Sequence, residues 1–354
     1  MAINNFSYHD EMSRTNIIKL REVIDTLPSF CRQYFRGIEE YTSTRTRLGY
    51  AYDIRLFFEF LHEKNSALNK VEIKEFRLEV LDLVKREDIE EYLEYLNLYE
   101  HKDKEITNDE HGKARKLSAI RSLYKYFYDA ELISTNPPSM VKPPKIHDKA
   151  IIRLEPDEVA LLLDTVEEGD KLTAAQKRFH NKTKLRDVAI LTLLLGTGIR
   201  VSECVGLDIG NIDFKTNAIL VKRKGGKEQF VYFGDEVYNA LTDYLEVRSK
   251  IIPCEGSEDA LFLSLQDKRI CVRAVENLVK KYSSTVTTLK KITPHKLRST
   301  YGTSLYRETG DIYLVADVLG HRDVNTTKKH YAAIEDDRRR QAANIVKLRE
   351  SKDP

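Results

Sequence analysis

Four short motifs in the second half of the chain carry side chains that suit chemistry on a phosphate group. An arginine presents a planar fork that can bind two phosphoryl oxygens, and two such forks can neutralise the charge of a pentacoordinate transition state. Each motif alone is a weak signal, because a Gly-His after an apolar run, for example, is usually a helix end. Together they supply two arginines, a lysine, two histidines and a tyrosine, in Gly196-Thr-Gly-Ile-Arg200-Val-Ser-Glu203, Lys224-Gly-Gly-Lys227, Thr293-Pro-His295-Lys-Leu-Arg298 and Leu319-Gly-His321 with Tyr331 ten residues later.

The motifs of nucleotide-dependent and magnesium-dependent chemistry are missing from the sequence. The segment Gly225-Gly226-Lys227 is followed by Glu228, where a phosphate-binding loop would have Ser or Thr. No compact group of carboxylates is spaced to hold magnesium. We therefore expect a reaction that uses no ATP, no metal ion and no other cofactor.

Composition excludes several classes of protein. The 354 residues include 58 Lys and Arg against 56 Asp and Glu, a net charge of +2, which excludes a histone-like polycation. The four cysteines form no C-x-x-C pair, which argues against a disulfide scaffold or a cysteine-rich zinc module. The strongest apolar run, residues 188–195, is far shorter than the ~20 residues of a membrane span, and residues 1–14 lack the apolar core of a secretion signal. We expect a cytoplasmic protein without a membrane partner.

The spacing of apolar residues predicts helices in both halves of the chain. Tyr50, Ile54, Phe57, Phe58 and Leu61 make one helical stripe, preceded by capping candidates at 42–44. A second stripe contains positions 117, 120, 124 and 127. Farther on, 187–195 is typical of a buried helix that ends at 196–198, a new helix begins near Arg200, and helices broken at Gly310 and Gly320 follow Pro294. Two β-prone runs, 218–221 and 230–233, flank the glycine pair at 225–226 and predict a hairpin that carries Lys222, Arg223, Lys224 and Lys227.

A proline-rich stretch marks the expected domain boundary. Residues 136–145 contain four prolines, which cannot occupy a helix interior and favour an extended linker. We expect an N-terminal domain at 1–135, a linker at 136–150 and a second domain at 151–335. A tail at 336–354 has apolar residues at helical spacing, namely Ala342, Ala343, Ile345, Val346 and Leu348.

The sign of the local charge inverts near the end of the first domain. Residues 71–110 are strongly acidic, whereas 111–125 contain five basic side chains and no acid. Ser118, Arg121 and Lys125 project from a different side of the helix than its apolar stripe, where they could meet phosphates. The alternative is an ordinary solvated face on a helical bundle.

The combined motifs resemble the tyrosine recombinases, also called phage-integrase-type site-specific recombinases. The motifs occur here in the family order with similar spacings. Arg45-Thr-Arg-Leu-Gly-Tyr-x-x-Asp-Ile-x-x-Phe-Phe-x-Phe-Leu61 resembles the family's core-binding domain, and residues 116–127 resemble its DNA-facing helix. Within the family, residues 179–190, 223–227 and 292–298 are most similar to Xer chromosome-dimer resolvases, particularly the single-recombinase type of streptococci.

This resemblance implies a mainly α fold. An all-helical, SAM-like core-binding domain would be joined to a mixed α/β catalytic domain that is mostly helical and has a small antiparallel sheet. The two domains would enclose duplex DNA with paired inverted half-sites, as a homotetramer on two sites whose tail helices dock on neighbouring protomers. A DNA translocase of the FtsK type is a candidate partner.

The resemblance also implies a role for each catalytic candidate. Tyr331 would attack the phosphodiester, leaving a 3′-phosphotyrosyl bond and a free 5′-hydroxyl. Lys224 would protonate the departing 5′-oxygen, with Lys222 and Lys227 as competing candidates. Arg200 and Arg298 would hold the non-bridging oxygens, His295 would assist proton removal, and His321 would bind a phosphoryl oxygen. Contacts to DNA are expected from Lys113, Lys116, Arg121, Lys125, Arg45, Arg47 and Lys227.

Two positions depart from the commonest family pattern. Ser299 stands where many relatives have a second histidine, and Tyr331 follows His321 by ten residues where nine is also common.

An integrase of a mobile element would share every catalytic residue, but residues 1–40 are too short for a comfortable additional arm-binding domain, which favours the Xer type. The complete catalytic set argues against an architectural DNA-binding protein without activity.

Overall fold

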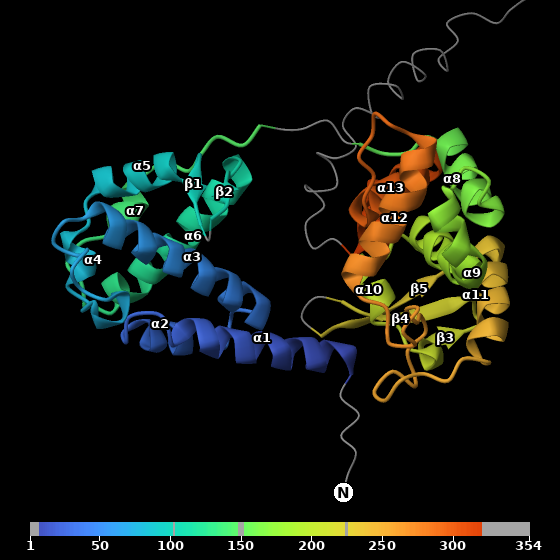
Figure 1. Ribbon diagram of the computed structural model, residues 1–354, viewed down its shortest axis with the longest axis horizontal. Coiled ribbons are helices and arrows are strands. Elements are labelled where there is room, and N and C mark those ends of the chain that lie inside the picture. Colours follow the sequence, from blue (N-terminus) through green and yellow to red (C-terminus); the bar gives the residue numbers. More distant parts are fainter. Residues whose placement is uncertain (1–6, 102, 148–151, 224–225, 321–354) are drawn as a thin grey trace, which may run out of the picture. The chain divides into compact units, whose positions relative to one another are not determined.

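The computed structural model describes residues 7–101, 103–147, 152–223 and 226–320 (Figure 1). The chain divides into two compact units, Met1–Lys149 and Ala150–Pro354. Both units are mostly helical, and the second contains a small antiparallel sheet, as expected. Within the described residues, no helix is long and apolar enough to cross a membrane.

The first unit is a helical bundle with one short two-stranded ribbon. Helix α3 packs between α1 and α6, and α6 also contacts α2 and α7. The ribbon pairs β1 with β2 in antiparallel register. The elements are α1 (Tyr8–Ile24), α2 (Cys31–Gly37), α3 (Thr44–Lys64), α4 (Val80–Leu83), α5 (Arg86–Tyr95), β1 (Tyr99–Glu100), β2 (Glu105–Ile106), α6 (Glu110–Asp129) and α7 (Pro137–Met140), with a 3-10 turn at Ile73–Glu75.

Both predicted apolar stripes lie in the core of this unit. Ile54, Phe57 and Phe58 of α3 are completely buried, and so are Ile120 and Phe127 of α6. The Ser43 hydroxyl accepts a hydrogen bond from the Thr46 amide, 3.2 Å away, and thereby caps α3 at the expected place. The local sequence pattern therefore placed the two central helices correctly.

The proline-rich stretch is not extended along its whole length. Pro137 and Pro138 occupy the first turn of α7, where a missing amide hydrogen costs nothing. Both prolines are buried, and α7 contacts α5 and α6. Residues 142–147, which follow, have no regular secondary structure. The expectation of an extended segment was therefore wrong for Pro137–Met140, because proline is excluded from helix interiors but not from the first helical turn.

The second unit is built around the long helix α9 and also contains the sheet. Helix α9 contacts α8, α10, α11 and α13, and α14 packs on α13. The sheet order is β3-β4-β5, all antiparallel. The elements are α8 (Pro156–Glu168), α9 (Ala174–Thr197), α10 (Val201–Val205), β3 (Ile212–Asp213), β4 (Ala218–Lys222), β5 (Glu228–Tyr232), α11 (Asp235–Arg248), α12 (Val272–Val286), α13 (Pro294–Thr309) and α14 (Ile312–Leu319), with a 3-10 turn at Ile209–Asn211.

Helix ends and the hairpin follow the sequence signals closely. Gly198, Gly310 and Gly320 each adopt left-handed backbone conformations and terminate α9, α13 and α14. The predicted hairpin is formed by β4 and β5, with Ala218 opposite Tyr232. Helix α9 begins earlier than predicted, at Ala174, because Thr173 and Gln176 form a capping box there.

Candidate active site

Arg200 stands at the start of α10, directly after the turn that ends α9. Its backbone amide donates to Glu203 Oε2 at 2.8 Å, and its Nη1 donates to Glu203 Oε1 at 2.8 Å. Glu203 therefore fixes both the backbone and the guanidinium of Arg200. The Arg200 side chain is still 37% exposed, so the guanidinium can reach a ligand from this position.

Gly198 allows two other helices to approach this turn. Its φ is +62°, and a Cβ built on it would lie 2.4 Å from Tyr301 Cδ1 and 2.9 Å from Leu319 Cδ2. Any side chain at residue 198 would therefore push α13 and α14 away from Arg200. The Thr-Gly-Ile-Arg motif thus combines a helix stop with close packing of the elements around the arginine.

Arg298 lies on α13 with its guanidinium buried beside the same turn. It donates hydrogen bonds from Nη1 to the Gly198 carbonyl and from Nη2 to the Leu319 carbonyl. Gly198 is only two residues before Arg200, so the fold brings together two arginines that are 98 positions apart in the sequence. Two guanidinium groups beside one turn are suited to binding a single phosphate.

Arg223 joins the same cluster, although the sequence analysis did not assign it a role. Its Nη1 donates to Glu203 Oε2 and to the Leu319 carbonyl, each at 3.2 Å, and its Nη2 donates to the Val318 carbonyl at 3.0 Å. Burial lowers the pKa of this guanidinium, while the neighbouring Glu203 carboxylate opposes that effect. The sequence feature that could have pointed to Arg223 was its position in the predicted hairpin, next to Lys224.

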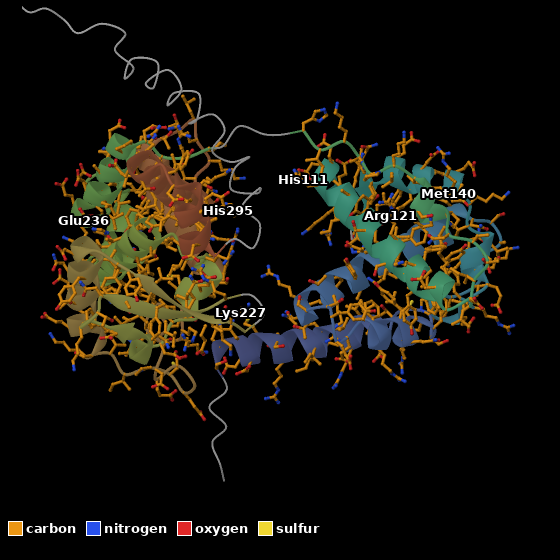
Figure 2. The ribbon with its side chains drawn as sticks, turned by 180° about the vertical axis from the view of Figure 1, so that it is seen from behind. His111, Arg121, Met140, Lys227, Glu236 and His295 are labelled. Atoms are coloured by element: carbon orange, nitrogen blue, oxygen red, sulfur yellow. The ribbon has the colours of Figure 1, made fainter. Side chains whose placement is uncertain are left out.

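His295 and two candidate lysines occupy more exposed positions. His295 follows Pro294 in the first turn of α13 and is exposed, as is Lys227 after the hairpin turn (Figure 2). The Lys227 carbonyl accepts a hydrogen bond from the Arg223 amide at 2.7 Å, which closes the turn. Lys222 ends β4 and is half-buried. Lys224, His321 and Tyr331 lie outside the described residues, as does the tail at 336–354.

Tyr301 on α13 lies beside Gly198, at the turn that precedes Arg200. It packs against Gly198, and burial raises the pKa of its phenol. A raised pKa disfavours the phenolate that a nucleophilic attack needs. Its environment is that of a packing residue between α13 and the end of α9.

The basic residues expected to contact DNA in the first unit divide into two groups. Arg45 and Lys125 are exposed, and Lys125 forms a surface ion pair with Asp129 at 3.0 Å. Lys113 is half-buried and donates a hydrogen bond to Asn97 Oδ1. These three side chains are available to a partner at the surface.

The other three basic residues point into the protein. Arg47 is buried and pairs with Glu39 at 2.8 Å. Lys116 is buried between Asn108 Oδ1, 3.0 Å from its Nζ, and Asp53. Arg121 donates hydrogen bonds to the Pro138 and Val141 carbonyls and so holds α7 against α6 (Figure 2). Helical position alone could not reveal this, because long basic side chains bend toward partners distant in sequence.

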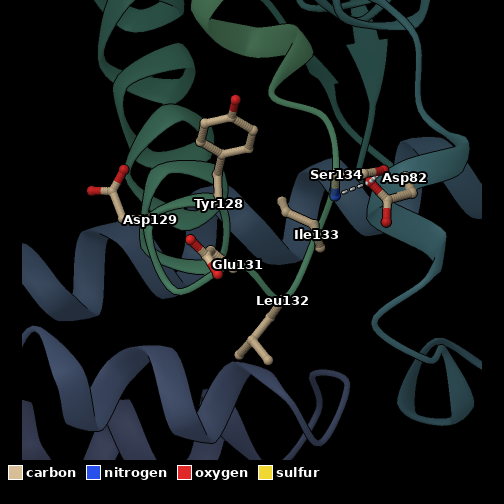
Figure 3. Close-up of a pocket in the computed structure, with 7 residues that line it drawn as sticks. All are labelled: Asp82, Tyr128, Asp129, Glu131, Leu132, Ile133 and Ser134. Atoms are coloured by element: carbon tan, nitrogen blue, oxygen red, sulfur yellow. Dashed lines mark hydrogen bonds between the residues drawn. The ribbon is translucent and has the colours of Figure 1, made fainter.

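A shallow acidic pocket lies on the first unit, at the loop that follows α6 (Figure 3). Asp82 at one side accepts hydrogen bonds from the Ser134 and Thr135 amides at 2.8 and 3.1 Å. The Ser134 and Thr135 hydroxyls donate to the same oxygen, Oδ1, so this carboxylate holds the loop. The pocket is lined by Asp82, Tyr128, Asp129, Glu131, Leu132, Ile133 and Ser134.

Comparison with known proteins identifies the family. Residues 153–338 match the phage integrase family. The chain is 34% identical over 322 residues to tyrosine recombinase XerC of Caldanaerobacter subterraneus subsp. tengcongensis, covering 88% of this chain and 84% of that protein. It is 30% identical over 345 residues to tyrosine recombinase XerS of Streptococcus agalactiae serotype III, covering 91% and 96%.

A solved structure supports the same fold. The XerH site-specific recombinase bound to palindromic difH substrate matches with a TM-score of 0.59 at 18% identity, covering 81% of this chain and 75% of that chain. The matched family segment contains Arg200 and Arg223, which share Glu203, and Arg298, which shares the Leu319 carbonyl with Arg223. The chain belongs to the phage integrase family and is a tyrosine recombinase, an enzyme that cleaves and rejoins DNA.

Proposed function

We propose that this chain is a Xer-type recombinase that resolves chromosome dimers by cutting and rejoining duplex DNA at a specific site. The convergence of Arg200 and Arg298 on one turn carries the chemical part of this proposal. The similarity to a XerS recombinase over 91% of this chain and 96% of that protein supports the Xer type. The target is a duplex with two inverted half-sites.

In the proposed cleavage step, the phenol oxygen of Tyr331 attacks the scissile phosphorus while the bond from phosphorus to the 5′-oxygen breaks. His295 assists removal of the phenolic proton, and Lys224 delivers a proton to the departing 5′-oxygen. One phosphate ester bond replaces another, so the strand is rejoined by the reverse reaction without an energy source. Lys222 and Lys227 are the alternatives for the acid.

The two arginines bind the phosphate whose charge increases during this step. Arg200 and Arg298 each offer several N–H donors to the non-bridging oxygens, and they concentrate positive charge where negative charge develops. Glu203 and the Leu319 carbonyl hold the guanidinium groups before DNA arrives. Such preorganisation lowers the barrier because no rearrangement is needed during the reaction. His321 adds a hydrogen bond to the same phosphate.

The assembly we propose is a tetramer on two sites, formed in the cytoplasm. The domains at 1–135 and 151–335, joined by 136–150, together enclose one half-site. The tail at 336–354 docks on a neighbouring protomer, and a DNA translocase of the FtsK type is the candidate partner that starts the reaction. Arg45, Lys113, Lys125 and Lys227 contact the DNA backbone, whereas Arg47, Lys116 and Arg121 support the helices that present them.

Covalent trapping tests this function. The wild-type protein is incubated with a library of nicked inverted-repeat duplexes, and protein–DNA adducts are recovered under denaturing conditions and sequenced. We expect adducts with one symmetric site, and none with Tyr331→Phe, although that variant binds the site with unchanged affinity. Adducts formed by Tyr331→Phe would assign the nucleophile to another residue.

The trapped sequence also separates the Xer role from that of a mobile-element integrase. A single site in the host chromosome supports dimer resolution. Sites at the ends of a transposable or phage element would support the alternative. Site-specific binding without any covalent adduct would instead support an architectural DNA-binding protein.

A further inference from the structure

Arg223 is buried at the meeting point of the β4–β5 hairpin and the end of α14. Only 8% of its side chain is exposed. Its Nε donates to Gln229 Oε1 at 3.2 Å, and its two terminal nitrogens bind Glu203 and the carbonyls of Val318 and Leu319. All three guanidinium nitrogens therefore have partners, and those partners come from three separate elements.

The Glu203 carboxylate connects Arg223 to Arg200. It accepts a hydrogen bond from Arg200 Nη1 at 2.8 Å and from Arg223 Nη1 at 3.2 Å. A buried carboxylate is stable as an anion only when paired, so loss of either arginine changes how strongly Glu203 holds the other. Arg223 thus affects the orientation of Arg200 without needing to touch DNA.

The Leu319 carbonyl connects Arg223 to Arg298 in the same way. It accepts from Arg223 Nη1 at 3.2 Å and from Arg298 Nη2. Arg298 also binds the Gly198 carbonyl, two residues before Arg200. Together with the backbone from Gly198 to Arg200, these hydrogen bonds form a closed circuit that includes Arg200, Glu203, Arg223 and Arg298.

Gly320 provides the space that this circuit requires. Its φ is +62°, and a Cβ built there would lie 3.1 to 3.2 Å from the Arg223 guanidinium. A side chain at residue 320 would crowd the guanidinium and its contacts with α14. The end of α14 is thus shaped to receive Arg223.

From this circuit we infer that Arg223 is a positioning residue for the reaction, which sets Arg200 and Arg298 at the separation needed to bind two non-bridging oxygens of one phosphodiester. The inference rests on the proposed function, since it concerns the phosphate bound by those two arginines. Lysine at this position would keep the positive charge, but its one nitrogen could not reproduce the contacts that Nε, Nη1 and Nη2 of Arg223 make at three separate points.

The test compares two scissile groups in the nicked duplex selected by covalent trapping. One carries the normal phosphodiester, and the other carries a methylphosphonate, in which a neutral methyl replaces one non-bridging oxygen. The second substrate needs less cationic stabilisation. Rates of adduct formation are measured for the wild type, Arg223→Lys and Arg223→Ala, together with their thermal unfolding.

Arg248→Lys is the matched control. Arg248 is also buried in the second unit, and it binds the backbone carbonyls of Glu258 and Ala260 at 2.8 to 3.1 Å. Its substitution disturbs a buried arginine of the same kind outside the circuit. Any rate loss that it causes should be equal on the two substrates.

We expect Arg223→Lys to slow adduct formation on the phosphodiester at least tenfold and on the methylphosphonate less than threefold, relative to the wild type on each substrate. Equal losses on the two substrates, as in the control, would overturn the positioning role and leave Arg223 a purely structural residue. If the wild type forms no adduct with any duplex, the proposed recombination chemistry fails, and this inference fails with it.

Discussion

The buried carboxylate of Asp53 in α3 pairs with Arg115, which follows it by 62 positions on α6. The Asp53 side chain is 3% exposed, whereas that of Arg115 is 52% exposed. Lys116 Nζ lies 3.7 Å from the other carboxylate oxygen. One buried acid thus anchors two consecutive basic residues of the helix that resembles a DNA-facing helix, and this ties its orientation to α3.

Asp53 and Lys116 should prove energetically coupled. Burial raises the pKa of Asp53 and lowers that of Lys116, so each charge depends on the other. Asp53→Ala should lower the free energy of unfolding by about 3 kcal/mol, because it leaves a buried ammonium without its partner. In a Lys116→Met background, the loss of unfolding free energy caused by Asp53→Ala should be smaller by at least about 1 kcal/mol. Urea unfolding of the four proteins measures this difference, and equal costs in both backgrounds would show that the pair is not coupled.

Lys224 is expected to be the general acid. Replacing the bridging 5′-oxygen of the scissile group by sulfur gives a leaving group that hardly needs a proton. Lys224→Ala should therefore cleave this substrate at close to the wild-type rate, while it cleaves normal DNA at least about 100-fold more slowly. Rates of adduct formation on denaturing gels measure both. If the sulfur substrate instead restores the cleavage rate of Lys227→Ala or Lys222→Ala, that lysine is the general acid.

Lys125 and Arg121, one turn apart on α6, should respond differently to substitution. Lys125 is 73% exposed, so Lys125→Ala should weaken binding to all DNA sequences and reduce the slope of log affinity against log salt by about 0.9. Arg121→Ala should mainly lower the unfolding temperature, because its guanidinium holds the Pro138 and Val141 carbonyls. Filter-binding titrations at several salt concentrations, with thermal unfolding alongside, distinguish the two. A reduced salt slope for Arg121→Ala at unchanged stability would show that it contacts phosphate.

Acid should weaken the attachment of the loop after α6, because it protonates the Asp82 carboxylate that holds this loop. Partial burial opposes ionisation of this carboxyl, but hydrogen bonds from Ser134 and Thr135 outweigh it and lower its pKa. A carboxylate with a lowered folded pKa stabilises the protein above its unfolded pKa, and that contribution is lost as the pH falls toward the folded value. Asp82→Asn should therefore lose less stability than the wild type between neutral pH and about pH 3. Parallel pH profiles of urea unfolding in the two proteins would contradict this assignment.

The tail should matter for assembly rather than for binding to one half-site. Its apolar residues at helical spacing need a surface to cover them. Truncation after Ala333 should leave the affinity for a single half-site within about twofold and abolish cooperative binding to paired sites. Gel-shift titrations with one and two half-sites measure both quantities. Unchanged cooperativity would mean that the tail packs on its own protomer.

Local sequence signals placed several of the main helices and the hairpin of the second unit. Capping residues, apolar spacing and glycines at helix ends depend on neighbours within a few positions, so α3, α6, the ends of α9, α13 and α14, and the β4–β5 hairpin could be predicted directly. Two predictions failed: α9 begins at Ala174, earlier than expected, and the prolines of Pro137–Met140 begin a helical turn where composition indicated an extended chain. The motifs and their order also identified the family, which the comparisons confirm.

Only the tertiary structure decided how the charged side chains are used. Glu203 and the Leu319 carbonyl each bind two arginines, and nothing in the spacing of residues 200, 223 and 298 specifies those shared partners. Likewise, Arg47, Lys116 and Arg121 have the composition of a basic face, but they bind Glu39, Asn108 and the Pro138 carbonyl within the protein. The physical reason is that a long, flexible cation can reach either solvent or the interior. Which of the two it reaches depends on the acceptors that distant segments bring within hydrogen-bonding distance.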